Sequence, residues 1–419
     1  MKNIIKYLTL TLSAVLLLLC AVPTVIADET AKSLDSGYAN VADFGAEGVD
    51  SKDDTEAFEA ALATGKSLYI PAGNYYVSKT IKLTNRIVKG AGPNSTTIFG
   101  TITDKTAPII IMEGVSSLCD LKVSFKDIKD CETANEGEKV GIQLGSKEKG
   151  LMPGSVLHSL VIAQVGTAIY NPKYAACDGI RIENVDISPF YRGVDMQGEN
   201  RKSNSYSNIY PNNHNVEKAI EIDCGFALEG SSYGETLHQI NVEHNAYSFA
   251  ALSLKNAKNF NFSSLHFEGT NLTKADSGTI YCENSSGYFG GVVQYFPYIN
   301  HFGNSFLRLG DSDGKNVIVF DIIHQRGLNG PDPGQHIDWC NDLLEVRGLD
   351  RGLVKGGPEA ADYVQFRRAK DAKGEYEITL NYYSYHTIIG GDGHRYRDFV
   401  KKGDNLTFNI THEPKEVLR

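Results

Sequence analysis

Short apolar segments alternate with polar turns along most of the chain. Between Cys119 and Arg347 the turns are rich in Asn, Gly, Ser and Asp. The apolar segments recur about every 22 to 32 residues, a period typical of a repeat architecture. One series has an apolar, variable, apolar pattern over its last three residues, apart from the final Asn171 of AIYN: GIQL (141–144), AIYN (168–171), GVDM (193–196), AIEI (219–222), ALSL (251–254), TIYC (279–282), FLRL (306–309) and LLEV (343–346). The pattern predicts the stacked rungs of a solenoid.

The alternation also predicts which side chains point outward. In a strand the apolar positions fill the interior and the variable ones face out, and stacked rungs lie about 4.8 Å apart. The predicted outward column is Gln143, Tyr170, Asp195, Glu221, Ser253, Tyr281, Arg308 and Glu345, and two residues further on stand Gln197, Asp223, Lys255, Glu283 and Arg347. In this arrangement Asp195 lies over Glu221, with Asp223 beside them.

Such a carboxylate cluster is consistent with glycoside hydrolysis. One carboxyl protonates the leaving oxygen, and the other attacks the sugar or activates water. Asp195 and Glu221 are the leading catalytic candidates, followed by Asp223. A purely structural surface would tend to avoid stacked like charges. An ordinary solvated surface of an acidic protein is nevertheless an open alternative.

Elimination is the second chemistry that fits the same face. In a lyase, acidic side chains hold calcium against a uronate carboxylate, and a basic or phenolic group removes the C5 proton. Basic and phenolic side chains within reach of the predicted face are Lys255, Arg308, Tyr281 and Arg192, and the first three are candidate substrate-binding residues. The sequence assigns no metal ligands and no cofactor, with calcium expected only if the enzyme is a lyase.

A second strand series predicts a rival site. It comprises LVIA (160–163), VDIS (185–188), INVE (240–243) and LHFE (265–268). Glu243 and Glu268 share a column in this register, and His266 points to the same side as Glu268 because the two are two residues apart. Histidine beside a carboxylate can serve as acid, base or sugar contact. These two glutamates are further catalytic candidates, and His266 is a candidate substrate contact. Surface hydrogen bonding is the alternative interpretation.

Aromatic residues near the C-terminal part of the series suggest a glycan cleft. The loop at 288–306 is rich in Tyr and Phe, and Trp339, the only tryptophan, lies in GPDPGQHIDWCND. Aromatic rings stack on the apolar faces of sugars, so Trp339 is a candidate substrate-binding residue. Covering an irregular part of the core is an equally acceptable role.

Residues 40–92 predict how the solenoid begins. Asp53 or Asp54 can accept hydrogen bonds from the amides at a helix start, and Phe58, Ala61 and Leu62 give that helix one apolar face. Three extended runs follow, separated by Pro, Gly and Asn. A helix covering the first coil would hide an open sheet edge.

This segment resembles the opening of the pectate-lyase-like superfamily, specifically the rhamnogalacturonase and epimerase-like pectate lyase domain. The matching residues are Val41, Asp43, Phe44, Gly45, Ala46, Asp53, Asp54, Thr55, Ile70, Pro71, Ala72, Gly73, Tyr75, Gly90 and Gly92. The resemblance implies an all-β, right-handed parallel β-helix with a short N-terminal capping helix, and polysaccharide as the substrate class. Because the superfamily includes hydrolases, lyases, epimerases and phage tail spikes, it does not imply the reaction.

The first 27 residues have the pattern of a secretory signal, with Lys2 and Lys6 before an apolar run and small residues at the exit. We expect a signal peptide at 1–27, an extension at 28–39, the β-helix at 40–349 and a β-rich cap at 350–419. The net charge of −10 makes nucleic acid an unfavourable partner. Six cysteines follow the leader, and Cys119 with Cys131 is the best candidate disulfide.

The sequence therefore predicts a secreted, extracellular enzyme that cleaves glycosidic bonds of a plant, algal or bacterial polysaccharide, with hydrolysis favoured over elimination. Its expected partner is the polysaccharide, with no membrane contact after leader removal, and a homotrimer is compatible with the fold class. A non-catalytic glycan-binding or tail-spike-like fibre is the alternative from another functional class.

Overall fold

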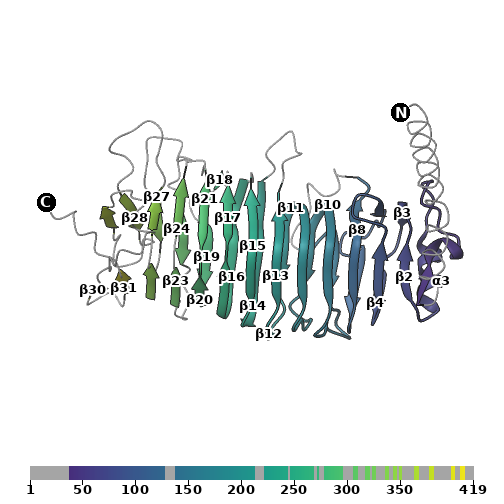
Figure 1. Cartoon of the computed structure of the whole chain (residues 1–419), viewed down its shortest axis with the longest axis horizontal. Coiled ribbons are helices and arrows are strands. Elements are labelled where there is room, and N and C mark those ends of the chain that lie inside the picture. The colour runs from purple at the N-terminus through teal and green to yellow at the C-terminus, as the bar shows by residue number, and fades with distance from the viewer. Residues whose placement is uncertain are drawn as a thin grey trace, which may run out of the picture.

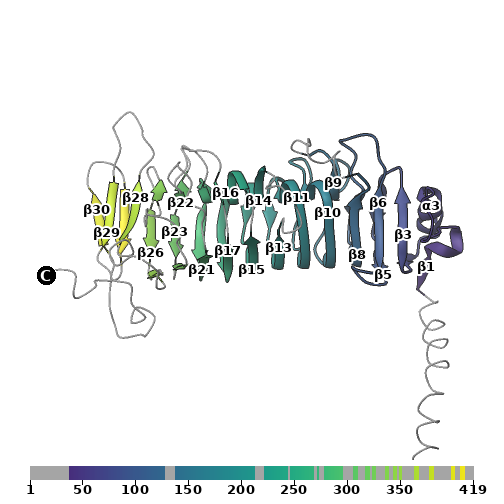
Figure 2. The same ribbon diagram turned by 90° about the horizontal axis from the view of Figure 1, so that it is seen from above.

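The computed structural model shows a long parallel β-solenoid whose rungs stack along one axis (Figure 1). It describes residues 37–127, 137–212, 221–243, 246–268, 271–272 and 278–295, and after these the separate strands between 305 and 410. Viewed from above, the strands run across the rod from α3 at one end to β28–β30 at the other (Figure 2). The expected solenoid is confirmed, because almost all strand pairs in the main sheet system are parallel.

The N-terminal third contains short strands and the one α-helix in the described part of the chain. Its elements are β1 (Tyr38–Asn40), η2 (Val41–Phe44), α3 (Thr55–Ala63), β2 (Ser67–Ile70), β3 (Gly73–Val77), β4 (Ile81–Thr84), β5 (Ile87–Gly90), β6 (Thr96–Gly100), β7 (Ile110–Glu113), β8 (Ser117–Phe125) and β9 (Val140–Leu144).

The central rungs contain long strands that bend around the corners of the coil. They are β10 (Val156–Asn171), β11 (Arg181–Met196), β12 (Arg201–Lys202), β13 (Ser205–Pro211), β14 (Glu221–Tyr233), β15 (Thr236–Glu243), β16 (Ala246–Ser263), β17 (Leu265–Glu268), β18 (Asn271–Leu272), β19 (Gly278–Glu283) and β20 (Ser286–Phe289). Register shifts within β10, β14 and β16 mark the bends.

The C-terminal strands continue the stack and end in antiparallel pairs. They are β21 (Val292–Tyr295), β22 (Ser305–Leu309), β23 (Val317–Phe320), β24 (Ile323–Arg326), β25 (His336–Asp338), β26 (Leu343–Val346), β27 (Leu349–Arg351), β28 (Tyr363–Arg367), β29 (Glu377–Asn381), β30 (Asp398–Lys401) and β31 (Leu406–Ile410). The antiparallel pairs are β28 with β29 and β30 with β31.

The core is a continuous apolar column inside the coil. Each rung adds one branched or aromatic side chain directly over the last, as strand alternation requires. One such column is fully buried and consists of Ile142, Ile169, Val194, Phe226, Leu252 and Ile280. The inward position expected for Cys282 is confirmed, since its side chain lies within the same core.

Helix α3 lies at the N-terminal end of the stack (Figure 1). Its predicted apolar face is confirmed, because Phe58 and Ala61 are buried and Leu62 packs against the core. Asp53 accepts a hydrogen bond from the Thr55 amide at 3.0 Å, as expected of a residue at a helix start. The helix thereby covers the first coil. In the described residues, no helix is both long and apolar enough to cross a bilayer.

Asp54 has a different role from Asp53, because it joins the first loop to a strand. Its Oδ1 accepts from the Glu47 amide at 3.0 Å, and its Oδ2 accepts from the Tyr76 amide at 2.9 Å. We expect Asp54→Ala to lower the free energy of unfolding by about 2 to 3 kcal/mol, since two partly buried hydrogen bonds are lost. Urea unfolding would measure this loss, and Asp43→Ala, at an exposed position in η2, is the control. Equal stabilities of the two variants would contradict the assignment.

The register corrects part of the predicted outward column. Asp195 pairs with Ala227, and Glu221 pairs with Ala246 instead of lying under Asp195. The physical reason is that β14 bends between Ile222 and Cys224, so that Glu221 precedes the corner on a different side of the coil. The column otherwise follows the prediction from Gln143 through Asp195, and from Ser253 through Tyr281 to Arg308.

The structure also differs from the predicted register at two rungs that the sequence prediction did not include. Glu345 pairs with Val319 in another ladder, and Asp338 takes the predicted place beside Arg308. In the second series, β13 inserts a rung, because Ile209 pairs with both Val185 and Ile240. The predicted pairing of Glu243 with Glu268 is confirmed.

Candidate functional site

The densest group of charged side chains in the described residues surrounds Arg192 near the middle of the rod. We call the side chains of Arg192, Asp195, Asp223, Glu229 and Lys255 the Arg192 cluster. They come from three consecutive rungs, namely β11, β14 and β16, which the parallel register places side by side. Residues that are far apart in sequence therefore meet on one outer face of the coil.

The guanidinium of Arg192 contacts all three carboxylates. Its Nη1 donates to Asp195 Oδ1 at 3.0 Å and to Glu229 Oε2 at 3.0 Å. Its Nε and Nη2 both reach Asp223 Oδ2, at 2.9 Å and 2.7 Å. A planar fork of donors suits this geometry, and lysine could not reproduce it. Arg192 therefore holds acids from two rungs in fixed positions.

Glu229 is the most highly connected carboxylate of the cluster. Besides Arg192, it contacts Lys255 Nζ at 3.0 Å and accepts from the Ser253 hydroxyl at 2.5 Å, both through Oε1. Lys255 Nζ also lies 4.8 Å from the Phe249 ring centroid and 5.7 Å from that of Tyr281. The two rings are tilted against each other with centroids 4.7 Å apart. One side of the cluster is thus an aromatic wall.

Electrostatics keeps the two best-connected groups charged. Burial alone would raise the pKa of Glu229, but Arg192 and Lys255 outweigh it and leave that pKa below its usual value. Burial would lower the pKa of Arg192, yet Asp195 and Glu229 raise it further above its already high value. Glu229 is therefore an anion and Arg192 a cation at any physiological pH.

Exposure decides which of these acids can meet a ligand. The Asp195 side chain is fully buried, and Gln197 Nε2 donates to it at 3.1 Å. In contrast, the side chains of Asp223 and Glu229 are 20% and 12% exposed, and Lys255 is 29% exposed. Asp195 can therefore orient Arg192, while Asp223 and Glu229 are the acids open to solvent.

A second cluster lies on another face, where β13, β15 and β17 are neighbours. Tyr210 donates to Glu243 Oε2 at 2.5 Å, and His266 Nε2 lies 3.1 Å from Glu268 Oε2 and 3.8 Å from Glu243 Oε1. Burial and the hydrogen bond to Glu243 raise the pKa of Tyr210, so the phenol keeps its proton and acts as a donor. The predicted association of Glu243, Glu268 and His266 is confirmed.

This second cluster has the residue types of a metal site. One ligand atom from each of Glu243, His266 and Glu268 lies within 4.8 Å of the others. Imidazole and carboxylate together suit transition-type divalent cations better than calcium, which prefers oxygen ligands alone. The three side chains could hold such an ion or serve as an acid and base pair.

The structure gathers four of the predicted site residues into the Arg192 cluster and its aromatic wall, namely Asp195, Asp223, Lys255 and Tyr281. Arg308 follows Tyr281 in the ladder. The side chains of Arg308 and Glu221, and all of Trp339 and Cys131, lie outside the described residues. The roles proposed for these residues stay predictions.

Sequence reasoning missed Glu229. The predicted neighbouring column placed Asp223 between Gln197 and Lys255, whereas Glu229 pairs directly with Lys255. A signal was present, since GFAL (225–228) has the same apolar, variable, apolar ending as AIEI a few residues earlier. Choosing GFAL would have brought Glu229 into the column.

Comparisons with known proteins agree with this architecture. Residues 38–110 match the family model described as "Rhamnogalacturonase A/epimerase, pectate lyase-like". In the pre-neck appendage protein of Bacillus phage B103, 54 residues are 46% identical, a match that covers 13% of this chain and only 6% of the phage protein. The local sequence similarity thus concerns a small part of a much longer relative.

Two solved structures are similar over most of the chain. The catalytic unit of a thermostable GH87 alpha-1,3-glucanase from Streptomyces thermodiastaticus strain HF3-3 aligns with a TM-score of 0.56 at 14% identity, covering 81% of this chain and 67% of the other. Tailspike protein 2 from Escherichia coli O157:H7 bacteriophage CAB120 aligns with a TM-score of 0.50 at 14% identity, covering 90% of this chain and 46% of the tailspike.

These findings define the class of protein. The chain has the fold of a right-handed parallel β-helix. The family resemblance expected from its N-terminal segment is confirmed by the rhamnogalacturonase and epimerase model that matches there. Fold similarity at this level of identity does not define the reaction.

Proposed function

We propose that this protein binds an extracellular polysaccharide along its β-helix and hydrolyses it at the Arg192 cluster. The observation that carries the proposal is the pair of partly exposed carboxylates, Asp223 and Glu229, held on one guanidinium beside the Phe249 and Tyr281 rings. Paired carboxyls are the groups that glycoside hydrolysis requires, and aromatic rings are the usual sugar platforms. Solved structures with this fold include a glucanase, which supports a glycan substrate.

The electrostatics suggests a division of roles. Glu229, held as an anion, acts as the nucleophile or as the base that activates water. Asp223 has the largest exposed fraction of the three acids, so a glycosidic oxygen can approach it, and we assign it the role of proton donor. Asp195 is a positioning residue, because it contacts Arg192 but is shielded from solvent.

The same geometry disfavours elimination at this cluster. Elimination needs a group that can accept the C5 proton, and Arg192 stays protonated because the surrounding carboxylates raise its pKa. Lys255 is engaged with Glu229 at 3.0 Å. Calcium-assisted elimination is therefore the less favoured enzyme activity.

A tail-spike-like binding role is the second candidate. It is favoured by the similarity to the CAB120 tailspike and by the short match to the phage B103 appendage protein. Stacked rungs can present a ligand surface without cutting anything. The export predicted from the N-terminal sequence would fit either role.

Incubation with a panel of neutral and acidic polysaccharides tests the proposal. We expect new reducing ends without the ultraviolet absorbance of an unsaturated uronate. Glu229→Gln should lower the rate by at least about 100-fold, as expected for loss of an essential acid or base. Glu183→Gln, at a partly exposed position on β11, is the matched control.

Other outcomes would lead to other conclusions. Unsaturated products would establish elimination, and binding without any product would establish the fibre role. Full activity of Glu229→Gln would place the reaction outside the Arg192 cluster, with Glu243 and Glu268 as the next acids to replace.

A further inference from the structure

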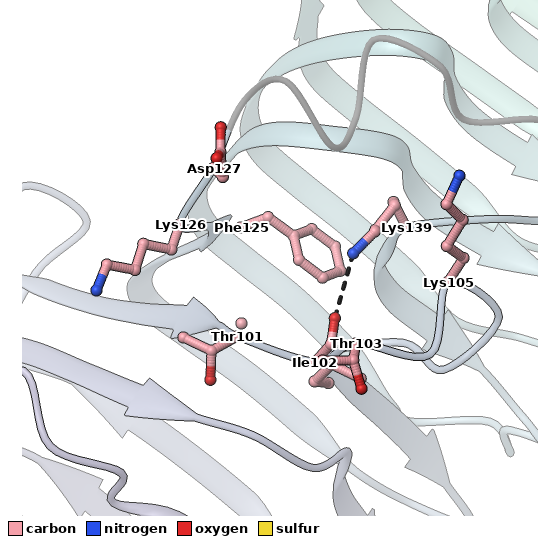
Figure 3. A pocket seen from close by; sticks show the side chains of 9 residues that line it. Thr101, Ile102, Thr103, Lys105, Phe125, Lys126, Asp127 and Lys139 are labelled. Atoms are coloured by element: carbon pink, nitrogen blue, oxygen red, sulfur yellow. Dashed lines mark hydrogen bonds between the residues drawn. The ribbon is translucent and has the colours of Figure 1, made fainter.

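A pocket of 500 Å³ opens on the N-terminal side of the Arg192 cluster. It lies where β6 and β8 end and β9 begins, and its wall contains Lys105, Lys126 and Lys139 together with Phe125 and Asp127 (Figure 3). We call it the lysine pocket. Residues 100–103, at the end of β6 and directly after it, complete its lining.

Lys139 is the most constrained of the three lysines. Lys139 is only 3% exposed. Its Nζ donates to the Ile102 carbonyl at 3.2 Å and lies 4.9 Å from the Phe125 ring centroid. Its backbone has a φ of 49°, a left-handed conformation that side chains other than glycine rarely adopt. The fold therefore places a cation in the wall of the pocket at a conformational cost.

The other two lysines widen the positive region. Lys126 Nζ lies 5.1 Å from the Tyr76 ring centroid, and Tyr76 stacks on Phe99 with centroids 5.3 Å apart. Figure 3 shows Lys126 on one side of Phe125, with Lys105 and Lys139 on the other. Three lysines and one aspartate line the pocket, so its lining carries a net positive charge in a chain whose net charge is −10. Such local focusing attracts anions.

The pocket and the Arg192 cluster share one ladder of strands. Lys139 immediately precedes Val140, which pairs with Thr167, which in turn pairs with Arg192. Two rungs correspond to about 10 Å along the rod. A polymer lying along the axis of the rod would therefore contact both the lysine pocket and the Arg192 cluster.

We infer that the lysine pocket binds an anionic substituent of the polysaccharide, namely a carboxylate, sulfate or phosphate group. The ammonium groups of Lys105 and Lys126, at exposed positions on the pocket wall, compensate its charge. The identity of the polymer rests on the proposed function, whereas the preference for anions rests on the pocket alone.

Binding measurements test the anion preference of the lysine pocket separately from the proposed hydrolysis. Calorimetry should use the full-length Glu229→Gln variant, because this variant avoids turnover during the titration. The ligands are oligosaccharides that carry uronate, sulfate or phosphodiester groups, together with a neutral gluco-oligosaccharide. We expect at least one anionic series to bind, and adding Lys105→Ala and Lys126→Ala should weaken it at least about tenfold. Lys66→Ala, which removes the same charge at an exposed site outside the pocket, is the control.

The outcomes distinguish the sources of the anion and the two proposals. The oligosaccharide series whose affinity falls in the double lysine variant identifies the anionic group that the pocket binds. Unchanged affinity in the double lysine variant, or equal binding of neutral and anionic oligosaccharides, would overturn the inference even if hydrolysis is observed. The Lys139→Met variant provides a third binding measurement. Its thermal unfolding is recorded as well, so that a loss of affinity can be distinguished from a loss of folded structure.

Discussion

Replacing Arg192 with methionine is expected to abolish polysaccharide cleavage and to lower the free energy of unfolding by about 3 to 5 kcal/mol at neutral pH. The guanidinium contacts Asp195, Asp223 and Glu229 at 3.0 Å or less, and its side chain is only 7% exposed. Methionine has a similar length but no charge. Its introduction would leave buried carboxylates facing one another.

The pH dependence of stability should reverse in this variant. In the wild-type protein the pKa of Glu229 is lowered, so its contribution is present above the unfolded-state pKa and is lost as pH falls through the lower folded-state pKa. Without Arg192, burial becomes the dominant influence and should raise that pKa. The folded state would then lose stability as pH rises past the unfolded-state value.

Urea unfolding across the acid-to-neutral range measures this reversal. Arg181→Met is the matched control, because Arg181 lies on the same strand β11 but its side chain is 59% exposed and 4.0 Å from Glu183. An exposed contact of this kind contributes less than about 1 kcal/mol. If Arg192→Met were as stable and as active as Arg181→Met, the Arg192 cluster would be an ordinary surface ion network.

The second large effect is expected inside the coil, at Arg201 and Glu235. Both side chains are fully buried, and Arg201 Nε lies 3.5 Å from Glu235 Oε1. Arg201 Nη1 donates to the carbonyls of Gly198 and Glu229, at 2.5 Å and 3.2 Å. This interior pair therefore supports the backbone that carries Glu229.

A double substitution in this pair should destabilise the protein by less than the sum of the two single substitutions. Arg201→Met leaves a buried carboxyl without its cation and should cost about 3 to 5 kcal/mol at alkaline pH. Arg201→Met combined with Glu235→Leu leaves no buried charge and should cost less than the two single changes added together. Lys89 and Asp120, an exposed pair 3.7 Å apart, provide a control cycle with small effects.

Glu235 also gives the stability a defined pH dependence. Burial raises its pKa to about 7, although Arg201 lowers it. The folded state keeps this proton up to about pH 7, whereas the unfolded carboxyl releases it near pH 4.3, so stability falls as pH rises between these values. The loss amounts to roughly 4 kcal/mol, and Glu235→Gln should abolish it. Unfolding at several pH values measures this slope, and an unchanged slope in the variant would contradict the assignment.

Much of the fold was predictable because solenoids repeat locally. The apolar spacing defined inward positions such as Ile142 and Val194, and the helix signals around Asp53 and Phe58 defined the first coil. Each of these inferences uses residues that are neighbours in sequence. These predictions therefore did not depend on the number of residues in each rung.

The candidate site was only partly predictable because it depends on register. Asp195, Asp223, Lys255 and Tyr281 were identified, yet Glu221 was placed where Ala227 lies, and Glu229 was missed. AIEI and GFAL have the same apolar, variable, apolar ending, and the last two residues of AIEI lie in the same strand as GFAL, β14. Periodicity has no means of choosing between them, because the choice depends on where that strand bends.

The amino-acid sequence by itself determined that short strands stack as a parallel solenoid with a helix at its N-terminal end, since alternation and turn residues act over a few positions. Only the tertiary structure decided that Arg192 binds acids from two rungs, and that Lys139 faces a pocket on the same ladder. The physical reason is that a corner shifts the strand register, and a shift of a few residues moves a side chain to another face of the coil.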